Sequence, residues 1–571
     1  MYKVVVGIDF GSSGTGYAYS YNNPEDIYLG KFPNQGIDSK VYTQIILDSK
    51  LEKVLAFGNE CNKYVNTNGL SENELYFKKI KMNLYEGSIF IKPENSSNEY
   101  PLEDVIAKIL EYIKKEAFNT IQNQKPKITL EEIKFIVTVP AIWDLSLKGI
   151  MIKASKKAGL FNQNTDILNF FALEPEAASI YCSSDKSIDT EYFMPGKSYI
   201  ICDLGGGTGD IVTHSITLDG DIIEKYSPIG GNYGSDEIDK AIFKRVFYKL
   251  FGFGDYNSLK KRNAEKGYLW HEDELYKEWV NFEEEIQNIK KITEDSRDKF
   301  FFLNCQLFEE FTDLNLEIIV KNYNKSCQEG WRVAIKNTKK WVLYFPFNII
   351  FDLIKEHSKI ISKQIAQIQK KVNDVESILY VGGYCSNEIL LNNIKEEFSE
   401  LSHLKPSRPE IAVVKGAVLF GINPEKIKFR IFPYTLGFNC DDDWNDAIHG
   451  KIGEQQYNNV TKKNVCLNSF HIFIKIGEII SKNHTITHNF ISIDSRYINL
   501  KFFKSLKSNP ILWTEEGVEL IGSDIIDLQN DYPINERNFT VTLKFGGTYV
   551  EAKCFHNQSK LEKDLPLYFN K

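Results

Sequence analysis

The chain has 571 residues, of which 42% are hydrophobic and 26% charged, as in ordinary globular proteins. Its formal net charge of −8 argues against general nucleic-acid binding, which needs clustered Lys and Arg. No apolar run is long enough to cross a bilayer, and the nine cysteines are scattered without a Cys-x-x-Cys pair. We therefore expect a cytoplasmic protein with reduced thiols that does not insert into membranes.

The first predicted element is a β-hairpin near the N-terminus. An apolar strand from Val4 ends at Asp9, a loop of glycines and hydroxyl residues follows, and a new alternating strand covers residues 17–21. Small residues let backbone N–H groups approach a phosphate, and hydroxyls add further donors. The loop residues that we expect to contact phosphate are Gly11, Ser12, Ser13 and Gly14.

The same pattern returns in the second half of the chain. An apolar run over 198–202 leads to Asp203, a glycine-rich loop and another strand over 211–216. Neither copy has the third glycine of a dinucleotide turn or the Lys-Ser/Thr pair of a P-loop. Two facing hairpins, each with an Asp that can hold a hydrated divalent cation, would grip a nucleotide tail, so the repetition predicts ATP binding. In this loop the expected phosphate contacts are Gly205, Gly206, Gly207 and Thr208.

Four further segments across about the first 425 residues carry recognisable motifs. They are Ile-Val-Thr-Val-Pro-Ala at 136–141, Ala-Leu-Glu-Pro-Glu-Ala-Ala at 172–178, Leu-Tyr-Val-Gly-Gly at 379–383 and the segment 413–421. With the two loops, they resemble the actin, hexokinase and 70-kDa heat-shock ATPase superfamily, and most of all its heat-shock members. The amino-acid sequences Gly-Tyr-Ala-Tyr-Ser at 16–20 and Lys-Gly-Ala-Val-Leu-Phe-Gly at 415–421 resemble those of the divergent heat-shock 70-kDa protein 12 branch.

The resemblance implies a site for ATP or ADP with Mg²⁺. Asp9 and Asp203 would hold the ion through water, and Asp210 would lie near the attacking water. Glu174 would orient that water, although a Glu before Pro is also an ordinary way to begin a helix.

The family's catalytic lysine is best matched by Lys78, whose charge would stabilise the γ-phosphate; Lys79 is the competitor, and a solvated helix face is the alternative for both. The adenosine side matches less well, because the family's arginine is missing after the two glycines of 382–383. There Tyr384 could stack on the base or belong to the core, and the charged helix of 283–294 could simply face solvent. The expected adenosine contacts are Gln287, Lys290, Lys291, Gly382, Gly383 and Tyr384.

The fold class implied is α/β: a two-lobed actin-like ATPase with duplicated ribonuclease-H-like lobes and insertions, followed by a β-sandwich. The ATPase domain would cover 1–425, with lobe I at about 1–181 and lobe II at about 197–425. A linker at 426–432 would follow, with Ile427, Phe429 and Ile431 alternating toward one face and Lys428 and Arg430 pointing outward.

Residues 433–571 show period-two alternation in segments 465–476, 485–493, 498–503, 518–526 and 539–545. This region resembles the family's peptide-binding β-domain without its helical lid, so a polypeptide client or partner protein is expected to bind there.

Three functions remain open. The first is a chaperone-like switch that binds ATP and hydrolyses it slowly. The second is a nucleotide-sensing scaffold with little or no hydrolysis, which a basic linker and a missing lid favour. The third is a small-molecule kinase of the same fold, which the heat-shock motifs speak against.

Overall fold

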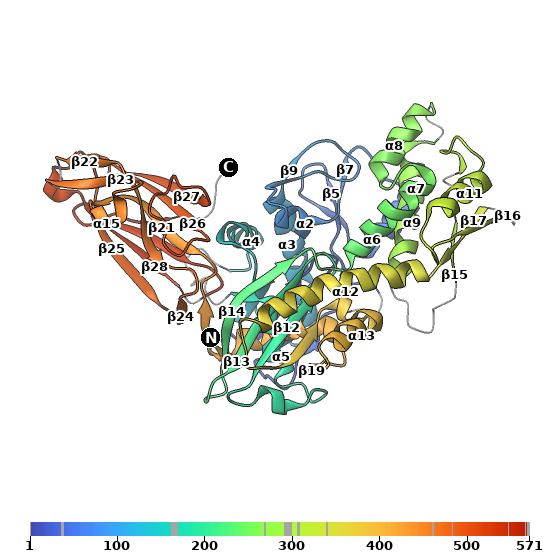
Figure 1. Cartoon of the computed structure of the whole chain (residues 1–571), viewed down its shortest axis with the longest axis horizontal. Helices are drawn as coiled ribbons and strands as arrows, with labels where there is room; N and C mark the ends of the chain where they lie inside the picture. The colour runs from blue at the N-terminus through green and yellow to red at the C-terminus, as the bar shows by residue number, and fades with distance from the viewer. Residues whose placement is uncertain are drawn as a thin grey trace.

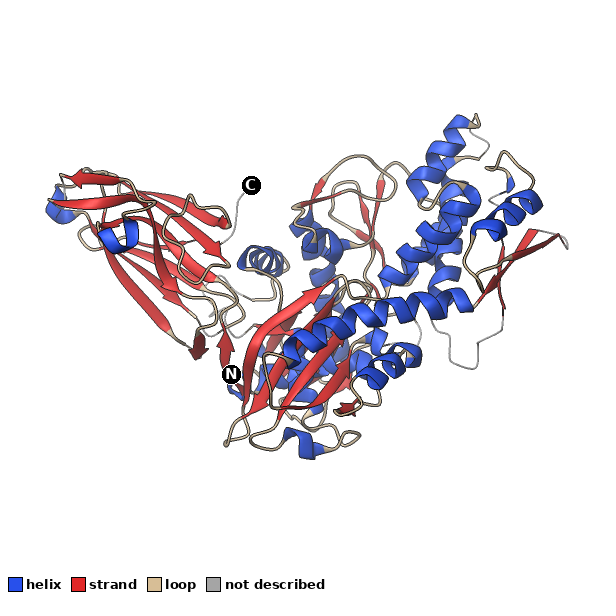
Figure 2. Ribbon diagram, viewed as in Figure 1, coloured by secondary structure: helices blue, strands red, loops and turns tan. Residues whose placement is uncertain are grey.

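The computed structural model describes residues 2–35, 39–161, 170–267, 270–289, 300–304, 309–337, 341–459, 462–481, 483–545, 547–565 and 567. The protein mixes helices and strands and contains several separate sheets, which confirms the α/β class in this general form. Figures 1 and 2 show an α/β body beside a second body, built mainly of strands, that comes from the C-terminal part of the chain.

The first large sheet contains both strands of the N-terminal hairpin, in the order β11-β10-β1-β2-β3, with β4 also pairing with β2. Its central strand β1 pairs in parallel with β10 and antiparallel with β2. All seven residues of β1 are buried, which explains its unbroken apolar run. The strands are β1 (Val4–Phe10), β2 (Gly14–Ser20), β3 (Tyr28–Leu29), β4 (Val41–Tyr42), β10 (Ile133–Val139) and β11 (Phe171–Leu173).

The second large sheet has the order β19-β18-β12-β13-β14-β20-β24. Its hairpin β12–β13 carries the second glycine-rich turn, and β12 pairs in parallel with β18. The last two strands come from the linker and the C-terminal region, so the sheet continues beyond the part of the chain that holds the motifs. The strands are β12 (Ser198–Leu204), β13 (Gly209–Ile216), β14 (Ile222–Gly231), β18 (Val375–Val381), β19 (Ser402–Leu404), β20 (Ile427–Ile431) and β24 (Ile479–Ser481).

Helices α5 (Glu174–Cys182) and α14 (Ala412–Ile422) join the two sheets. Helix α14 contacts β1 and β10, α5 contacts β12, and the two helices pack against each other. Their backbones approach so closely that a Cβ on Gly416 would lie 1.7 Å from the carbonyl oxygen of Ala177. A glycine is therefore required where the helices cross.

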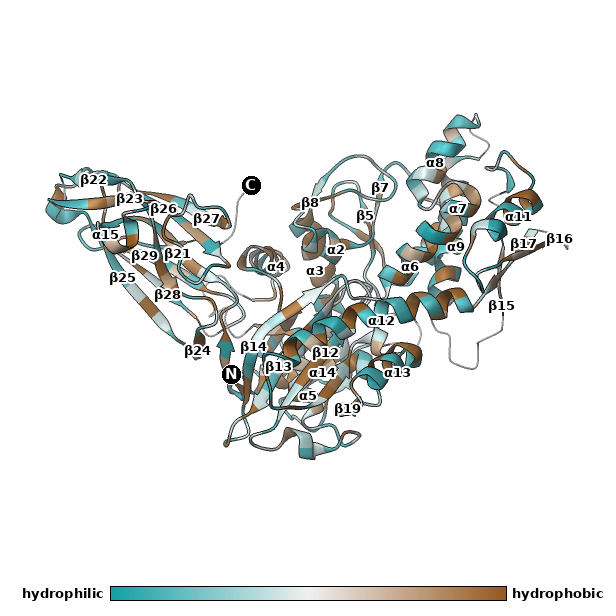
Figure 3. Ribbon diagram, in the orientation of Figure 1, coloured by the Kyte–Doolittle hydropathy of each residue, from teal (hydrophilic) through white to brown (hydrophobic). Residues whose placement is uncertain are grey.

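Other helices are α3 (Leu102–Gln124), which contacts β2, α4 (Leu145–Lys157), which packs against α3, α12 (Asn348–Gln369), which contacts β13, and α13 (Glu388–Glu397), which packs against α12. Helix α12 lies along the second sheet, and its colouring alternates between hydrophilic and hydrophobic (Figure 3). This is the pattern of a helix that buries one stripe and exposes the other. None of the helices in the described ranges is both long enough and apolar enough to span a bilayer.

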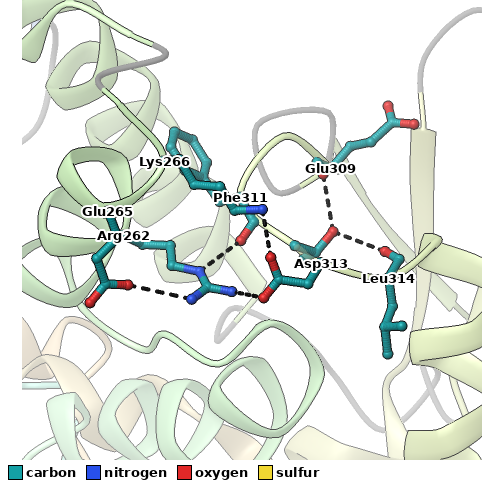
Figure 4. A network of polar contacts seen from close by, with 8 residues as sticks. Arg262, Glu265, Lys266, Glu309, Phe311, Asp313 and Leu314 are labelled. Carbon is teal, nitrogen blue, oxygen red and sulfur yellow. Dashed lines mark hydrogen bonds and ion pairs between the residues drawn. The ribbon is translucent and has the colours of Figure 1, made fainter.

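Two insertions supply the smaller elements. The first contains the sheet β6-β5-β7, the β8–β9 pair and two short helices, and the second contains the sheet β15-β17-β16 with several helices. In the second, Arg262 donates to the carbonyl of Phe311 at 3.1 Å and pairs with Asp313, which also binds Lys266 at 2.6 Å (Figure 4). The elements are β5 (Ile45–Asp48), β6 (Val54–Phe57), α1 (Glu60–Asn68), β7 (Glu74–Phe77), α2 (Ile80–Tyr85), β8 (Phe90–Ile91), β9 (Tyr100–Pro101), α6 (Asp236–Ile242), α7 (Tyr248–Phe251), α8 (Tyr256–Glu265), α9 (Glu272–Ile289), β15 (Phe300–Asn304), α11 (Leu316–Ser326), β16 (Ala334–Asn337) and β17 (Trp341–Pro346).

The C-terminal region forms one sheet in the order β22-β23-β21-β26-β27 and another in the order β25-β28-β29-β30. Phe438 of the first sheet and Phe490 of the second have ring centroids 4.9 Å apart, so apolar side chains meet between them. The five strands predicted here are confirmed, with ends shifted by at most two residues. The elements are β21 (Thr435–Asp443), α15 (Asp446–His449), β22 (Gln455–Asn458), β23 (Lys463–Ile474), β25 (Thr485–Ile491), β26 (Tyr497–Ser505), β27 (Val518–Asp527), β28 (Asn538–Lys544), β29 (Glu551–His556) and β30 (Glu562–Leu565).

The linker strand β20 pairs in parallel with β14. The prediction of which linker side chains point outward is wrong. Arg430, expected to point outward, has a side chain that is only 15% exposed, and it forms two contacts with Glu176, at 2.6 and 2.8 Å. Phe429, expected on the same face as Ile427, is 39% exposed, whereas Ile427 is buried. A buried carboxylate next to the strand therefore decides its facing, which hydrophobic alternation alone does not reveal.

Candidate functional site

The two glycine-rich turns lie against each other. A Cβ on Gly206 would come within 1.7 Å of the Ser13 hydroxyl oxygen, and one on Gly207 within 2.9 Å of the Ser12 Cβ. Ser13 Oγ also donates to Asp236 at 3.3 Å, which links the first turn to α6. The turns therefore face each other as the sequence predicts, and glycine is the residue that allows this approach.

Four buried carboxylates stand beside these turns. Asp9 is the next-to-last residue of β1, Asp203 lies near the end of β12 opposite Asp210 on β13, and Glu174 is the first residue of α5. Burial raises the pKa of Asp203 well above its usual value, and the charges of Glu174 and Asp210 raise it further. Burial, with Glu174 next in effect, raises the pKa of Asp210 to about 7. The structure thus brings the four predicted carboxylates together, and the charges of the other three all act on Asp203.

Two lysines offset part of this charge. Lys81 Nζ lies 2.6 Å from Glu174 Oε1, and Lys40 Nζ lies 2.5 Å from Asp9 Oδ2. Burial alone would lower the pKa of Lys40, but Asp9, assisted by Asp203, outweighs burial and raises it. Neither lysine was among the predicted site residues.

The predicted lysine is placed elsewhere. Lys78 Nζ lies 3.3 Å from Glu283 of α9 and 5.1 Å from the centre of the Tyr76 ring. Lys79 precedes α2 with a left-handed backbone, at φ 52°. Of the lysines in this segment, the one that reaches the carboxylates is therefore Lys81, three residues beyond Lys78. Its position between the apolar residues 80 and 82 is the one sequence signal that marks it as buried.

A cavity of about 1270 Å³ extends from the first turn between α2, α6 and α9. Ser12 and Ser13 line one part of its wall, and the segment that follows β18 lines another. Of the predicted residues it brings together Ser12, Ser13, Lys78, Gln287, Gly383 and Tyr384.

The predicted adenosine contacts differ in their surroundings. Gly382 has φ 87°, and a Cβ there would lie 2.4 Å from the carbonyl oxygen of Leu204, so its glycine is required. Tyr384 is almost fully buried, with its hydroxyl 3.2 Å from His357 Nδ1 and the two rings stacked at 5.7 Å. This burial favours the interpretation that Tyr384 belongs to the protein core over the interpretation that it stacks on the base. Lys290 and Lys291 lie outside the described residues.

Comparison with known proteins agrees with the resemblance. The chain is 24% identical to human heat shock 70 kDa protein 12A and 21% identical to human heat shock 70 kDa protein 12B, each over 96% of this chain and 89% of the relative. It is 23% identical to the chaperone protein DnaK of Thermosipho melanesiensis over 73% of this chain and 59% of that protein. No family model matches the chain. The similarity to the 70-kDa heat-shock family, and to its protein 12 branch, is confirmed.

Proposed function

We propose that the protein binds ATP between its two glycine-rich turns and acts as a slowly hydrolysing, heat-shock-70-like switch on polypeptide partners. The observation that carries this proposal is the joint placement of facing turns, four buried carboxylates and an adjoining cavity. Similarity to proteins named for the 70-kDa heat-shock family, over nearly the whole chain, supports the same conclusion.

We assign the first large sheet to lobe I, the second to lobe II and the strand-rich C-terminal region to a β-sandwich that binds polypeptide. The duplicated hairpins β1–β2 and β12–β13 support the two-lobed reading, because each sheet carries one copy at its centre. The likeness to a protein named as a chaperone supports a polypeptide-binding role for this chain.

The donor set fits a hydrated magnesium ion. Buried carboxylates that raise one another's pKa are relieved by a divalent cation, and Mg²⁺ prefers oxygen ligands while keeping several of its waters. No three of the four carboxylates have oxygens that all lie within 4.8 Å of one another, which suits contact through water. Asp9 and Asp203 would hold the ion, which when bound supplies positive charge beside the phosphates.

The remaining side chains have separate tasks. Glu174 and Asp210 would orient a water molecule, and Asp210, with its pKa near 7, can accept that water's proton at neutral pH. Lys81 would stabilise negative charge on the terminal phosphate. Lys81 is already paired with Glu174, and Lys40 with Asp9. Because these pairs neutralise part of the positive charge that would otherwise act on the phosphates, we expect slow turnover.

Phosphate release from ATP, measured with and without an unfolded polypeptide, tests this proposal. A slow rate that changes when the polypeptide is added supports the switch. ATP binding without measurable release would indicate a nucleotide-sensing scaffold instead. Fast release that depends on an added sugar or polyol would indicate a small-molecule kinase.

A further inference from the structure

A cluster of mixed polar ligands lies in the C-terminal region, far along the chain from the carboxylates described above. Cys440 Sγ, an Asp442 carboxylate oxygen and a His471 ring nitrogen all lie within 4.8 Å of one another. All three residues are half-buried, so an ion can reach them from solvent. Within the described ranges no other group of three His, Cys, Asp or Glu residues meets this distance.

Strand geometry explains how these side chains meet. Cys440 and Asp442 are two residues apart on β21, and both side chains reach His471. In the neighbouring antiparallel strand β23, His471 pairs with Phe438. The register shifts between Cys440 and Asp442, an irregularity of the kind that re-aims side chains.

The histidine is held at both ring nitrogens. Its Nδ1 lies 3.0 Å from Asp442 Oδ1, and its Nε2 lies 2.6 Å from Nδ1 of His488. His488 belongs to β25, in the other sheet of the region. Histidines that bind metals nearly always hydrogen-bond through the second ring nitrogen, because this fixes the ring's orientation and tautomer.

We propose that Cys440, Asp442 and His471 bind Zn²⁺, with His488 as the residue that orients His471. One sulfur, one nitrogen and one oxygen ligand suit zinc, whereas Mg²⁺ and Ca²⁺ prefer oxygen ligands alone. Three protein ligands leave a fourth tetrahedral position for water or for a group from a partner. A bound ion would join β21 to β23 and, through His488, the two sheets of the C-terminal region to each other.

The test uses the full, tag-free chain in the absence of ATP. Zinc titrated calorimetrically should bind at one site per chain, and Co²⁺ in its place should give the near-ultraviolet absorption band of a thiolate–cobalt bond. Cys440→Ser should remove the band, and both Cys440→Ser and His471→Asn should weaken zinc binding at least tenfold. His488→Asn should weaken it by about 10–100-fold, as expected for a partner outside the ligand set.

Matched controls separate this site from scattered thiols and imidazoles. Cys327→Ser changes a half-buried cysteine of another region, and His484→Asn changes an exposed histidine close in sequence to His488. Both controls should keep the zinc affinity and the cobalt band. Binding that is equal in Cys440→Ser, His471→Asn and the controls would overturn the proposal, and so would a wild-type cobalt complex without the thiolate band, whatever the folding of the variants.

Discussion

The buried ion pair between the linker and the α/β body offers the sharpest test of how the regions are joined. Arg430 of β20 contacts Glu176 of α5 at 2.6 and 2.8 Å, and their side chains are only 15% and 4% exposed. Nearby, the Glu224 carboxylate accepts a hydrogen bond from the Ile431 amide at 2.8 Å, and burial raises the pKa of Glu224 to about 8. Arg430→Met would leave the buried Glu176 carboxylate without the guanidinium that contacts it.

Removing one partner of a buried pair costs about 3–5 kcal/mol, whereas an exposed pair contributes about 0–1 kcal/mol. Lys428, two residues earlier, is the matched control, because its Nζ lies 3.5 Å from Asp221 and its side chain is 43% exposed. Arg430→Met should therefore release the linker from the sheet, and Lys428→Met should leave it docked.

Limited proteolysis of segment 426–432 and urea unfolding measure both effects. The double variant Arg430→Met with Glu176→Gln should recover part of the loss, because the unpaired charge is removed as well. Equal protease sensitivity and equal unfolding free energies for Arg430→Met and Lys428→Met would refute the reasoning.

Three further predictions concern catalysis, pH and the turns. Lys81→Met should lower ATP turnover by about 10²–10³-fold, and more than Lys78→Met does; the reverse order would restore Lys78 as the catalytic lysine. Because the pKa of Glu224 is raised from 4.5 to about 8, its contribution to the free energy of unfolding is full below pH about 4.5 and is lost as the pH rises through about 8. The urea unfolding free energy of Glu224→Gln should therefore fall less steeply with pH across this window than that of the wild-type protein. An identical slope in the two proteins would contradict the assignment. Gly206→Ala should weaken ATP binding at least tenfold while the protein stays folded, because the added methyl would lie 1.7 Å from Ser13 Oγ and force the turns apart; unchanged affinity by calorimetry would show that their close approach is not needed.

Local patterns predicted much of the fold. The apolar run, Asp and glycine turn appear twice because each hairpin is a contiguous unit, and the structure forms both at the expected residues. The Glu-Pro pair begins α5 at Glu174, as expected for a proline in the first turn of a helix. The period-two alternation of the C-terminal region likewise gave the strands, because each has one face toward apolar neighbours.

Contacts between distant segments could not be predicted in the same way. Lys40 reaches Asp9 from a loop about thirty residues away, and Lys81 is one of three closely spaced lysines, of which Lys79 is exposed. The facing of Arg430 depends on Glu176, more than 250 residues earlier. The zinc-ligand cluster depends on a register shift between β21 and β23, which no alternation pattern records.

Calorimetric titration of ATP into the wild-type protein and Asp203→Asn, each with and without Mg²⁺, tests the central claim most directly. The account predicts that wild type binds ATP with an affinity that depends on Mg²⁺, and that folded Asp203→Asn loses this dependence, because Asp203 would hold the hydrated ion beside the phosphates. Equal ATP affinity in both proteins with Mg²⁺, or no ATP binding by the wild-type protein, would contradict it.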